Sequence, residues 1–430
     1  MADVKAFKAM RYNENLTGDI ENLVTPPYDI ITPDKQKAYY QKNENNVIRL
    51  EYGMAEDSDN EQENKYTRAK KTLEEWISKN VLVKDEKPAY YIYEQVFSVD
   101  GAQKAFKGIF SRVKIEEFSK EVVLPHEETL SKAKTDRFSL MCETNCNFSP
   151  IYLLYLDEQK KIVRVIDQNS SGEPDISFMS EDGITQNIWI VTNEAEIAKI
   201  ENGFADKQLF IADGHHRYET ALNYRNKMRE ENPNYSIDAG FNFVMSFLVE
   251  MDNDGLLVFP THRMLKDLKD FSEVDITEKL SEDFKVERVQ STDIETEITS
   301  QDNKIFGLYT GKDYYYKITL KDKDAMSKYL PEKSSYYRNL DVSILHTMIL
   351  ERFFGIDKEN MANQTNLIYT RSYDEAMDRV KNGEFQCSFI INATKIREIK
   401  DVSLSKEKMP QKSTYFWPKL VTGIVMNELI

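Results

Sequence analysis

The stretch "FIADGHHRYETAL", residues 210–222, constrains the fold more than any other part of the chain. Its first residues complete "KQLFIA", residues 207–212, a short apolar run that is typical of a buried strand. After it, "HRYETALNYRNKMREEN" places its apolar residues on or near one helical face. Gly214 stands between the two patterns and permits a positive φ. The sequence therefore predicts a strand, a tight turn and a helix in direct succession.

The turn between this predicted strand and helix has the chemistry of an anion site. A helix start presents free backbone N–H groups and the positive end of the helix dipole. Arg217 can hold phosphate oxygens in a bidentate manner, and His215 or His216 can donate a hydrogen bond or transfer a proton. Asp213 can orient a histidine or hold Mg²⁺ through water. The alternative is that Asp213 only caps the helix. Capping does not call for two histidines and an arginine, so we favour a ligand-binding role.

The length of the chain sets the expected domain organisation. At 430 residues it exceeds the size at which one hydrophobic core usually stops growing. After about Lys266 the sequence becomes acidic and less hydrophobic, as at a domain boundary or in an insertion. We expect a first domain over residues 1–270 that carries the turn, and a second α/β domain over 271–430. Whether the C-terminal strand region returns to the site is left open.

The remaining patterns predict an α+β fold with mixed sheets and flanking helices. "AYYIYEQVF" and "KAFKGIFSRVKIEEF" have the composition of a β-hairpin. "SPIYLLYLD", "FNFVMSFLVEM" and "FQCSFIINA" are apolar runs of buried strands. "LDVSILHTMILERFFGI" has the spacing of a helix that ends near Gly355.

Charge and hydropathy limit the partners. A net charge of −16 repels phosphate backbones, so no nucleic acid is expected. The N-terminal sequence lacks the apolar core of a signal peptide, and no window approaches about 18 uninterrupted apolar residues. We therefore expect a cytoplasmic protein without membrane contact. Three cysteines are too few and too scattered for a disulfide framework.

A second polar segment is "LPHEETLSKAKTDRFSL", residues 124–140. Its "HEETL" resembles the start of a zinc-protease motif, but Leu130 stands where a second histidine is required, which excludes that class. What remains is an acid/base cluster, in which a carboxylate takes a proton and cations hold an anion, or a polar loop before a solvated helix. The residues do not decide between the two. The candidates are His126, Glu127, Glu128, Asp136 and Arg137.

Two shorter segments could contribute to a site. In "PQKSTYFWPK", the residues Lys412, Ser413 and Thr414 offer a cation and two hydroxyls to a phosphate, but no glycine-rich loop precedes them, so a P-loop is excluded. Taken alone, the segment is more typical of an aromatic strand with a polar lead-in. In "VTPPYDII", two prolines stiffen the backbone and present Asp29 in a binding loop or in an ordinary turn.

Several blocks of the sequence, in order, are similar to the signature blocks of a bacterial family catalogued as domain of unknown function 1015. They are "VTPPYDII", "LPHEETL" with "KTDR", "NFSPIYLLY", "IADGHHRYETAL", "FPTHRML", "LDVSILH" and "MPQKSTYFWPKLVTG". The family name supplies no reaction.

A more distant resemblance is local. "ADGHHRYETA" resembles the helix-start motif of the ParB and sulfiredoxin superfamily, in which a Gly-x-His-Arg element binds nucleotide phosphates, and "TPPYD" is similar to its entry segment. That superfamily includes clamp proteins, sulfiredoxins and free-serine kinases. The resemblance implies a ParB/sulfiredoxin-like nucleotide-binding core with large insertions. It also implies phosphate contacts at Gly214, His215, His216 and Arg217, with Asp213 close to metal or substrate.

These features together predict a small-molecule kinase that uses ATP or ADP with Mg²⁺ and takes free L-serine as a candidate acceptor. Arg217 and the helix start would neutralise phosphate charge, aided by Arg137, Lys412, Ser413 and Thr414. The general base is sought among Glu127, Glu128 and Asp29, and His126 and His216 are the candidates for proton transfer.

Two alternatives remain beside the kinase. The first is a nucleotide-sensing regulatory protein with a ParB-like fold. The second, weaker one is a metal-dependent hydrolase built on the five histidines at positions 126, 215, 216, 262 and 346. The expected partners are a nucleotide and a small-molecule substrate, with a homo-oligomer as a further expectation.

Overall fold

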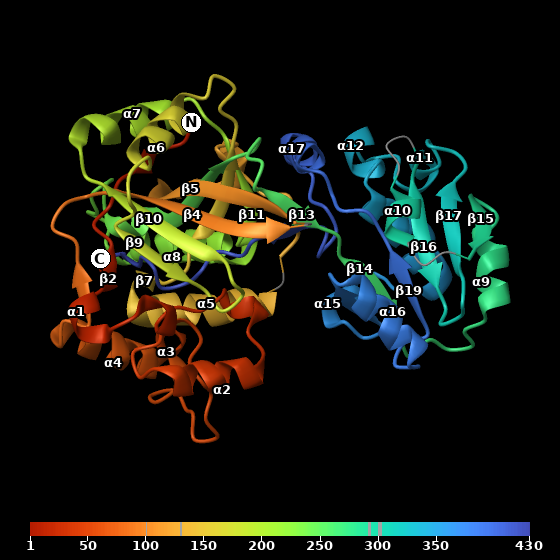
Figure 1. Ribbon diagram of the computed structural model, residues 1–430, viewed down its shortest axis with the longest axis horizontal. Helices are drawn as coiled ribbons and strands as arrows, with labels where there is room; N and C mark the ends of the chain where they lie inside the picture. Colours follow the sequence, from red (N-terminus) through yellow and green to blue (C-terminus); the bar gives the residue numbers. More distant parts are fainter. Residues whose placement is uncertain (100, 130, 291–293, 300–302) are drawn as a thin grey trace. The chain divides into compact units, whose positions relative to one another are not determined.

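The computed structural model describes residues 1–99, 101–129, 131–290, 294–299 and 303–430, without the side chains of 131–133. The chain forms two compact units. Unit 1 comprises Met1–Leu124, Leu130–Leu257 and Pro418–Ile430, and unit 2 comprises Pro125–Thr129 and Val258–Trp417. The second unit thus begins before the expected boundary at residue 271. The C-terminus lies within unit 1 (Figure 1).

Unit 1 is built on a nine-stranded mixed sheet with the order β6-β11-β8-β12-β5-β4-β10-β9, and β1 pairs with β5. Its strands are β1 (Val4–Lys5), β4 (Tyr90–Val99), β5 (Ala102–Lys114), β6 (Val123–Leu124), β8 (Ile151–Tyr155), β9 (Ile176–Met179), β10 (Thr185–Val191), β11 (Leu209–Asp213) and β12 (Phe243–Glu250). The short strands β2 (Met10–Tyr12) and β3 (Leu82–Lys84) pair with each other, as do β7 (Cys146–Asn147) and β21 (Asn427–Glu428). The predicted hairpin is confirmed as the antiparallel pair β4–β5.

The centre of this sheet explains why its strands read as uninterrupted apolar runs. Every residue of β12 is buried, and β12 runs parallel to β8 and antiparallel to β5. A strand covered on both faces has no solvated side on which to place polar residues. Side chains of α6, α7 and α8 join these strands in one hydrophobic core.

The helices of unit 1 precede or connect these strands (Figure 1). They are α1 (Glu14–Thr17), α2 (Pro33–Lys42), α3 (Ile48–Glu51), α4 (Lys65–Ser78), α5 (Ser131–Thr144), α6 (Lys161–Asn169), α7 (Glu194–Phe204) and α8 (His215–Glu231). Helix α8 packs against α5, and α5 packs against α4. These contacts connect the predicted turn before α8 with the segment around Arg137 on α5.

Unit 2 contains a six-stranded antiparallel sheet with the order β15-β17-β16-β19-β14-β18. Its strands are β14 (His262–Leu265), β15 (Phe284–Val289), β16 (Ile305–Tyr309), β17 (Tyr315–Leu320), β18 (Leu367–Thr370) and β19 (Cys387–Ile390), and β13 (Leu257–Phe259) pairs separately with β20 (Tyr415–Trp417). Its helices are α9 (Glu273–Leu280), α10 (Ile294–Ile298), α11 (Met326–Tyr329), α12 (Ser335–Arg338), α13 (Asp341–Ile344), α14 (Arg352–Phe354), α15 (Lys358–Asn363), α16 (Tyr373–Lys381) and α17 (Ile396–Leu404).

One helix of unit 2 departs from the regular geometry that its spacing predicts. The segment after Leu340 is helical through Phe354, and Gly355 ends it with φ of 63°. Its central residues, Leu345–Glu351, form a π-helix between α13 and α14. The wider π turn changes which side chains share a face, and π segments often occur at functional sites.

The observed architecture confirms the predicted α+β class, with mixed sheets, flanking helices and more than one unit. The ParB/sulfiredoxin-like character of unit 1 stays a prediction. Within the described ranges, no helix has the length and apolar character needed to cross a membrane.

Candidate functional site

The predicted strand–turn–helix forms as expected. Strand β11 ends at Asp213, Gly214 has φ of 95°, and α8 begins at His215. Because Gly214 occupies the N-cap position, the helix start has no capping side chain. A Cβ on Gly214 would lie 3.2 Å from the guanidinium group of Arg217. Glycine therefore serves both the backbone conformation and the close approach of Arg217 to the turn.

The carboxylate of Asp213 pairs with the cationic side chains of Lys419 and Arg217 and does not cap the helix. Its Oδ2 accepts a hydrogen bond from Lys419 Nζ at 2.9 Å, and Arg217 Nη2 lies 3.9 Å from the same oxygen. Its Oδ1 accepts from the N–H of Gly214 at 2.8 Å. Burial alone would raise the pKa of Asp213, but Lys419 and Arg217 outweigh it and hold the pKa well below its ordinary value. The capping alternative is therefore wrong for Asp213.

Arg217 is fixed at the turn by the protein itself. Its Nη1 donates to the carbonyl oxygen of Pro150 at 2.5 Å, and only 12% of the side chain is exposed. One face of the guanidinium group covers the position where a Gly214 side chain would stand. Arg217 and Lys419 thus bring two cations to the helix start, where both face Asp213.

The segment around Arg137 lies in the same unit and meets the predicted loop at residues 24–31. Arg137 is buried and donates to Asp136 Oδ2 and to the backbone oxygen of Glu51, at 2.7 Å in the second case. Its guanidinium carbon lies 4.2 Å from the ring centroid of Tyr28. Arg137 is therefore held by protein groups and packs on the loop that also carries Asp29.

Asp136 is the second carboxylate held by cations in unit 1. Its Oδ1 accepts from Lys65 Nζ at 2.5 Å and from the hydroxyl of Tyr66 at 2.8 Å, while Arg137 binds its other oxygen. Burial by itself raises the pKa of Asp136, but Arg137 and Lys65 lower it to about 2. This carboxylate is ionised at neutral pH and cannot act as an acid there.

Glu51, for which the sequence predicts no role, lies near both Arg137 and Arg217. Its Oε1 accepts from the hydroxyl of Ser149 at 2.8 Å and lies 3.4 Å from Arg137 Nη1. A cavity of about 30 Å³, room for about two waters, is lined by Glu51, Arg137, Ser149 and Arg217 among others. Burial raises the pKa of Glu51, and Arg137 and Arg217 oppose that shift. The "IRLE" that contains it gave no local signal of this role.

The other residues of unit 1 that the sequence predicts at the site differ in how far they are buried. His215 is 7% exposed and lies close enough to Asp213 to help lower its pKa. His216 and Arg217 are half-buried on the first turn of α8, and Asp29 is exposed beside Tyr28. Burial raises the pKa of Tyr28 to about 12, and Arg137 and Arg217 oppose that shift.

The other predicted residues belong to unit 2, where two distant segments meet. His126 Nε2 lies 3.0 Å from the hydroxyl of Thr414, and Glu127 Oε1 accepts from the N–H of Lys412 at 3.0 Å. Glu128 Oε1 pairs with Lys358 at 3.0 Å. The hydroxyl of Ser413 donates to the carbonyl of Pro410 at 2.5 Å. The predicted acid/base cluster is therefore divided, because Asp136 and Arg137 lie in unit 1.

The described residues do not support a protein-built metal site. They contain no group of three or more His, Cys, Asp or Glu side chains arranged to hold a metal ion. Two of the histidines, His215 and His216, lie in unit 1, and the other three lie in unit 2. Asp213, the expected Mg²⁺ ligand, already faces Lys419 and Arg217, so it does not fit a divalent cation in this arrangement. The metal-dependent hydrolase has no ligand set here.

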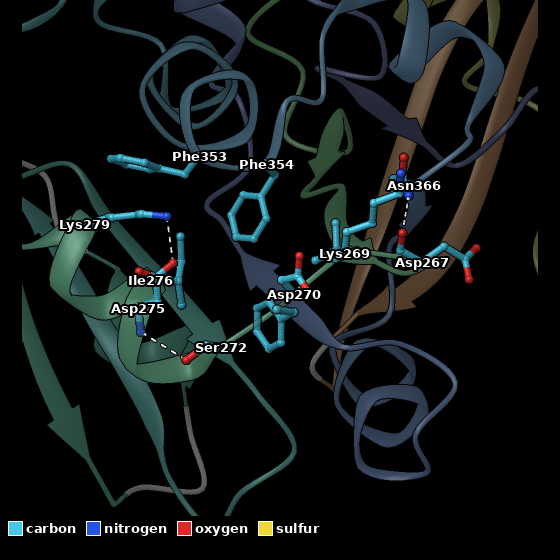
Figure 2. A pocket seen from close by; sticks show the side chains of 12 residues that line it. Asp267, Lys269, Asp270, Ser272, Asp275, Ile276, Lys279, Phe353, Phe354 and Asn366 are labelled. Carbon is cyan, nitrogen blue, oxygen red and sulfur yellow. Dashed lines mark hydrogen bonds and ion pairs between the residues drawn. The ribbon is translucent and has the colours of Figure 1, made fainter.

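A larger pocket, of about 400 Å³, lies in unit 2 and contains none of the residues predicted from the sequence. Figure 2 shows Phe353 and Phe354 on its wall, and Phe271 stacks on Phe354 with ring centroids 6.5 Å apart. On helix α9, which also lines the pocket, Lys279 pairs with Asp275 at 2.7 Å.

Comparison with known proteins gives one family and several distant folds. A family model described as "Protein of unknown function (DUF1015)" matches residues 4–343. A mutant free serine kinase in complex with AMP covers 75% of this chain and 91% of its own, with 13% identity and a TM-score of 0.38. Another mutant in complex with ADP gives the same coverage, identity and TM-score.

Two further structures complete the comparison. A conserved hypothetical protein from Pyrococcus furiosus has 14% identity and a TM-score of 0.35, over 75% of this chain and 97% of its own. SbnI from Staphylococcus aureus has 12% identity and a TM-score of 0.35, over 74% of this chain and 86% of its own. At these TM-scores the likeness carries no argument about function. No curated protein matches the sequence.

Proposed function

The chain belongs to the family described as "Protein of unknown function (DUF1015)", and from the chemistry of its own site we propose that it is a small-molecule kinase. It would transfer phosphate from ATP or ADP to a hydroxylated metabolite, with free L-serine as the first acceptor to test. The proposal is carried by the turn between β11 and α8.

Three features of that turn support phosphate binding. The positive end of α8 meets two cations, Arg217 and Lys419, at one point. Gly214 has no side chain to block the backbone N–H groups of the helix start. Asp213 holds both cations in place before a ligand arrives, and preorganised charge is what phosphoryl transfer chiefly requires.

We assign the roles of hydrogen-bond donor to phosphate and of general base from the positions of the histidines and of Asp29 in unit 1. His215 and His216 stand on the first turn of α8, where a ring N–H can donate to a phosphate oxygen. Among the candidate bases Asp29, Glu127 and Glu128, we assign Asp29, since it is exposed and adjoins Tyr28 on Arg137. Mg²⁺ would enter on the nucleotide phosphates, because it commonly binds through substrate phosphates and few protein carboxylates.

The test is a product search with the purified full chain. The protein is incubated with ATP or ADP, Mg²⁺ and a pool of hydroxylated metabolites that includes L-serine, and phosphorylated products are followed by mass spectrometry. We expect a phosphorylated acceptor with one of the two nucleotides. Asp29→Asn should lose product formation while still binding nucleotide, since it lies outside the phosphate-binding turn.

Two outcomes would change the conclusion. Nucleotide binding without any phosphorylated product would indicate the nucleotide-sensing protein instead. Failure to bind ATP and ADP at all, measured by calorimetry, would reject both functions.

A further inference from the structure

The strand β14 of unit 2 carries a buried arginine that the proposed function does not use. Arg263 has no exposed surface and lies between β18 and β19, paired with Tyr369 and Phe389. It stands in the sequence "PTHRML", and a charged residue on an interior strand is unexpected.

Within the described ranges, Arg263 forms hydrogen bonds to neutral groups only. Its Nη1 donates to the carbonyl of Thr261, and its Nη2 donates to the carbonyl of Lys412 at 3.3 Å and to His346 Nε2 at 3.4 Å. Its Nε is buried without a hydrogen-bond partner, and among the described residues the guanidinium group forms no ion pair, although the carboxylate of Glu127 lies close enough to raise its pKa against the effect of burial. A buried cation that forms no ion pair is costly, so a structure that keeps one has a reason for it.

The contact with His346 fixes the protonation of that imidazole. Arginine has only donors, so Nε2 of His346 must accept and the ring proton must be on Nδ1. Nδ1 is buried and, among the described residues, has no acceptor. His346 stands on the π-helical segment Leu345–Glu351, which brings it to the strand.

A third donor faces the same arginine. The ring centroid of Tyr369, on β18, lies 5.4 Å from the guanidinium carbon of Arg263, and the buried hydroxyl of Tyr369 has no partner among the described residues. Three buried groups without a hydrogen-bond partner among the described residues are thus Nε–H of Arg263 itself, Nδ1–H of His346 and the phenolic O–H of Tyr369, and both other residues contact the guanidinium group. The group that would satisfy them is an oxyanion, which supplies negative charge and several acceptors.

We propose that unit 2 binds a small oxyanion, a carboxylate or a phosphate group, at Arg263, His346 and Tyr369. The anion reaches Arg263 by displacing the carbonyl of Lys412, whose side chain is exposed and whose backbone has φ of 56°. Glu127 holds that position through the N–H of Lys412, so the segment forms a cover over the arginine. This site is independent of the proposed kinase activity.

The experiment separates this site from the turn at Arg217. The full-length Arg217→Ala protein, which lacks the proposed phosphate contact of unit 1, is titrated with phosphate, with acetate, and with chloride at matched ionic strength. Thermal unfolding and the nitrogen-15 NMR signals of the histidine side chains are recorded. We expect phosphate or acetate, but not chloride, to raise the unfolding temperature in a saturable way and to shift the Nδ1 signal of His346, assigned with His346→Gln.

The variant that tests the arginine is Arg263→Met, which keeps the volume and removes the charge. It should lose the anion response by at least about tenfold in apparent affinity, and without anion it should unfold at the same or a higher temperature than the parent. Arg288→Met, which removes an arginine stacked on Tyr314 elsewhere in unit 2, should keep the response.

The two anions distinguish the source of the group. A response to acetate alone indicates a carboxylate ligand, and a response to phosphate alone indicates a phosphate ligand. No saturable response of the unfolding temperature or of His346 to either anion would overturn the proposal. So would an equal response in Arg263→Met, and the NMR readout on the parent decides the matter even if that variant does not fold.

Discussion

The Arg217 side chain makes two kinds of contact at the turn, and their effects on ligand binding and on stability can be measured separately. Its guanidinium group faces Asp213 and Gly214, and it also donates to the carbonyl of Pro150. The second contact means that removing the side chain leaves a buried carbonyl without its donor. Removing the side chain is therefore expected to affect stability as well as ligand binding.

Arg217→Ala should weaken nucleotide binding and modestly destabilise unit 1. Loss of a charge-assisted contact to phosphate costs about 1.5–3 kcal/mol, which is roughly tenfold to a hundredfold in affinity. Loss of the hydrogen bond to Pro150 should lower the free energy of unfolding by about 1 kcal/mol. Calorimetry with ATP and ADP and urea unfolding give the two numbers.

Lys227→Ala is the matched control, because Lys227 lies on the same helix and forms a surface pair with Glu231. It should change neither value appreciably. Equal losses of affinity in the two variants would remove Arg217 from the site.

Asp136 should make unit 1 sensitive to acid. Its pKa, about 2 in the folded protein, lies below the ordinary value of 3.8 because Arg137 and Lys65 outweigh burial. A depressed carboxyl pKa adds stability above the unfolded value and loses it as the pH falls through the folded value. The stabilising effect, about 2 kcal/mol, should therefore be complete above pH 4 and disappear toward pH 2.

The measurement is the free energy of unfolding of the parent and of Asp136→Asn between pH 7 and about pH 2. The difference between them should shrink as the pH falls below 4. A difference that stays constant over this range would show that Asp136 has an ordinary pKa.

At the scale of an element, the turn between β11 and α8 depends on Gly214. Alanine there must adopt φ of 95° and place a Cβ 3.2 Å from Arg217. We expect Gly214→Ala to destabilise the protein by about 1–3 kcal/mol and to displace Arg217, so that nucleotide affinity falls as well. Unfolding and binding measurements check both effects.

Gly172→Ala is the control for that substitution. Gly172 also lies in unit 1, but its backbone is ordinary and a Cβ would meet nothing within 4 Å. It should be neutral in both measurements. If Gly214→Ala behaves in the same way, the turn tolerates a side chain and its glycine has no special role.

The elements also show what the sequence alone could reveal. The hairpin β4–β5 and the succession of β11, Gly214 and α8 follow from composition and periodicity within neighbouring residues, and both are confirmed. Lys419 could not be found in this way, since it pairs with Asp213 across 206 positions. Glu51 likewise meets Arg137 across 86 positions. Periodicity carries no information about which distant segments pack together.

The π-helix of unit 2 shows a different limit. The spacing in "LDVSILHTMILERFFGI" predicts a helix, and one forms, but nothing in the spacing indicates the π turn at Leu345–Glu351. Within this π turn, His346 contacts Arg263 of the neighbouring strand β14. Tertiary contacts decide such departures from a local preference.

At the scale of the whole molecule, the two units are not consecutive along the chain. Residues 125–129 leave unit 1 for unit 2, and Pro418–Ile430 return to unit 1 after the second unit is complete. A single boundary near residue 270 could not describe this arrangement. Unit 1 therefore includes the last segment of the chain, whereas the rest of its sequence precedes most of unit 2.

Deletion of residues 418–430 should disrupt unit 1 far more than loss of one ion pair. The segment exchanges backbone hydrogen bonds between Thr422 and Thr25 and between Met426 and Met10, and its strand β21 pairs with β7. Leu420, Ile424, Val425, Met426 and Leu429 are buried. We expect the loss of stability to exceed about 4 kcal/mol, which is beyond the range of ordinary single substitutions.

Lys419→Met separates the ion pair from the packing. It removes the cation at Asp213 but keeps the buried side chains and the backbone pairs of the segment, so unit 1 should remain folded and lose mainly nucleotide affinity. Hydrogen exchange distinguishes the two variants. The amides of β12, buried at the centre of the unit 1 sheet, should stay protected in Lys419→Met and become exchangeable in the deletion variant. Protection of β12 in the deletion variant equal to that in the full chain would show that unit 1 folds without the returning segment, and that Pro418–Ile430 only deliver Lys419 to the turn.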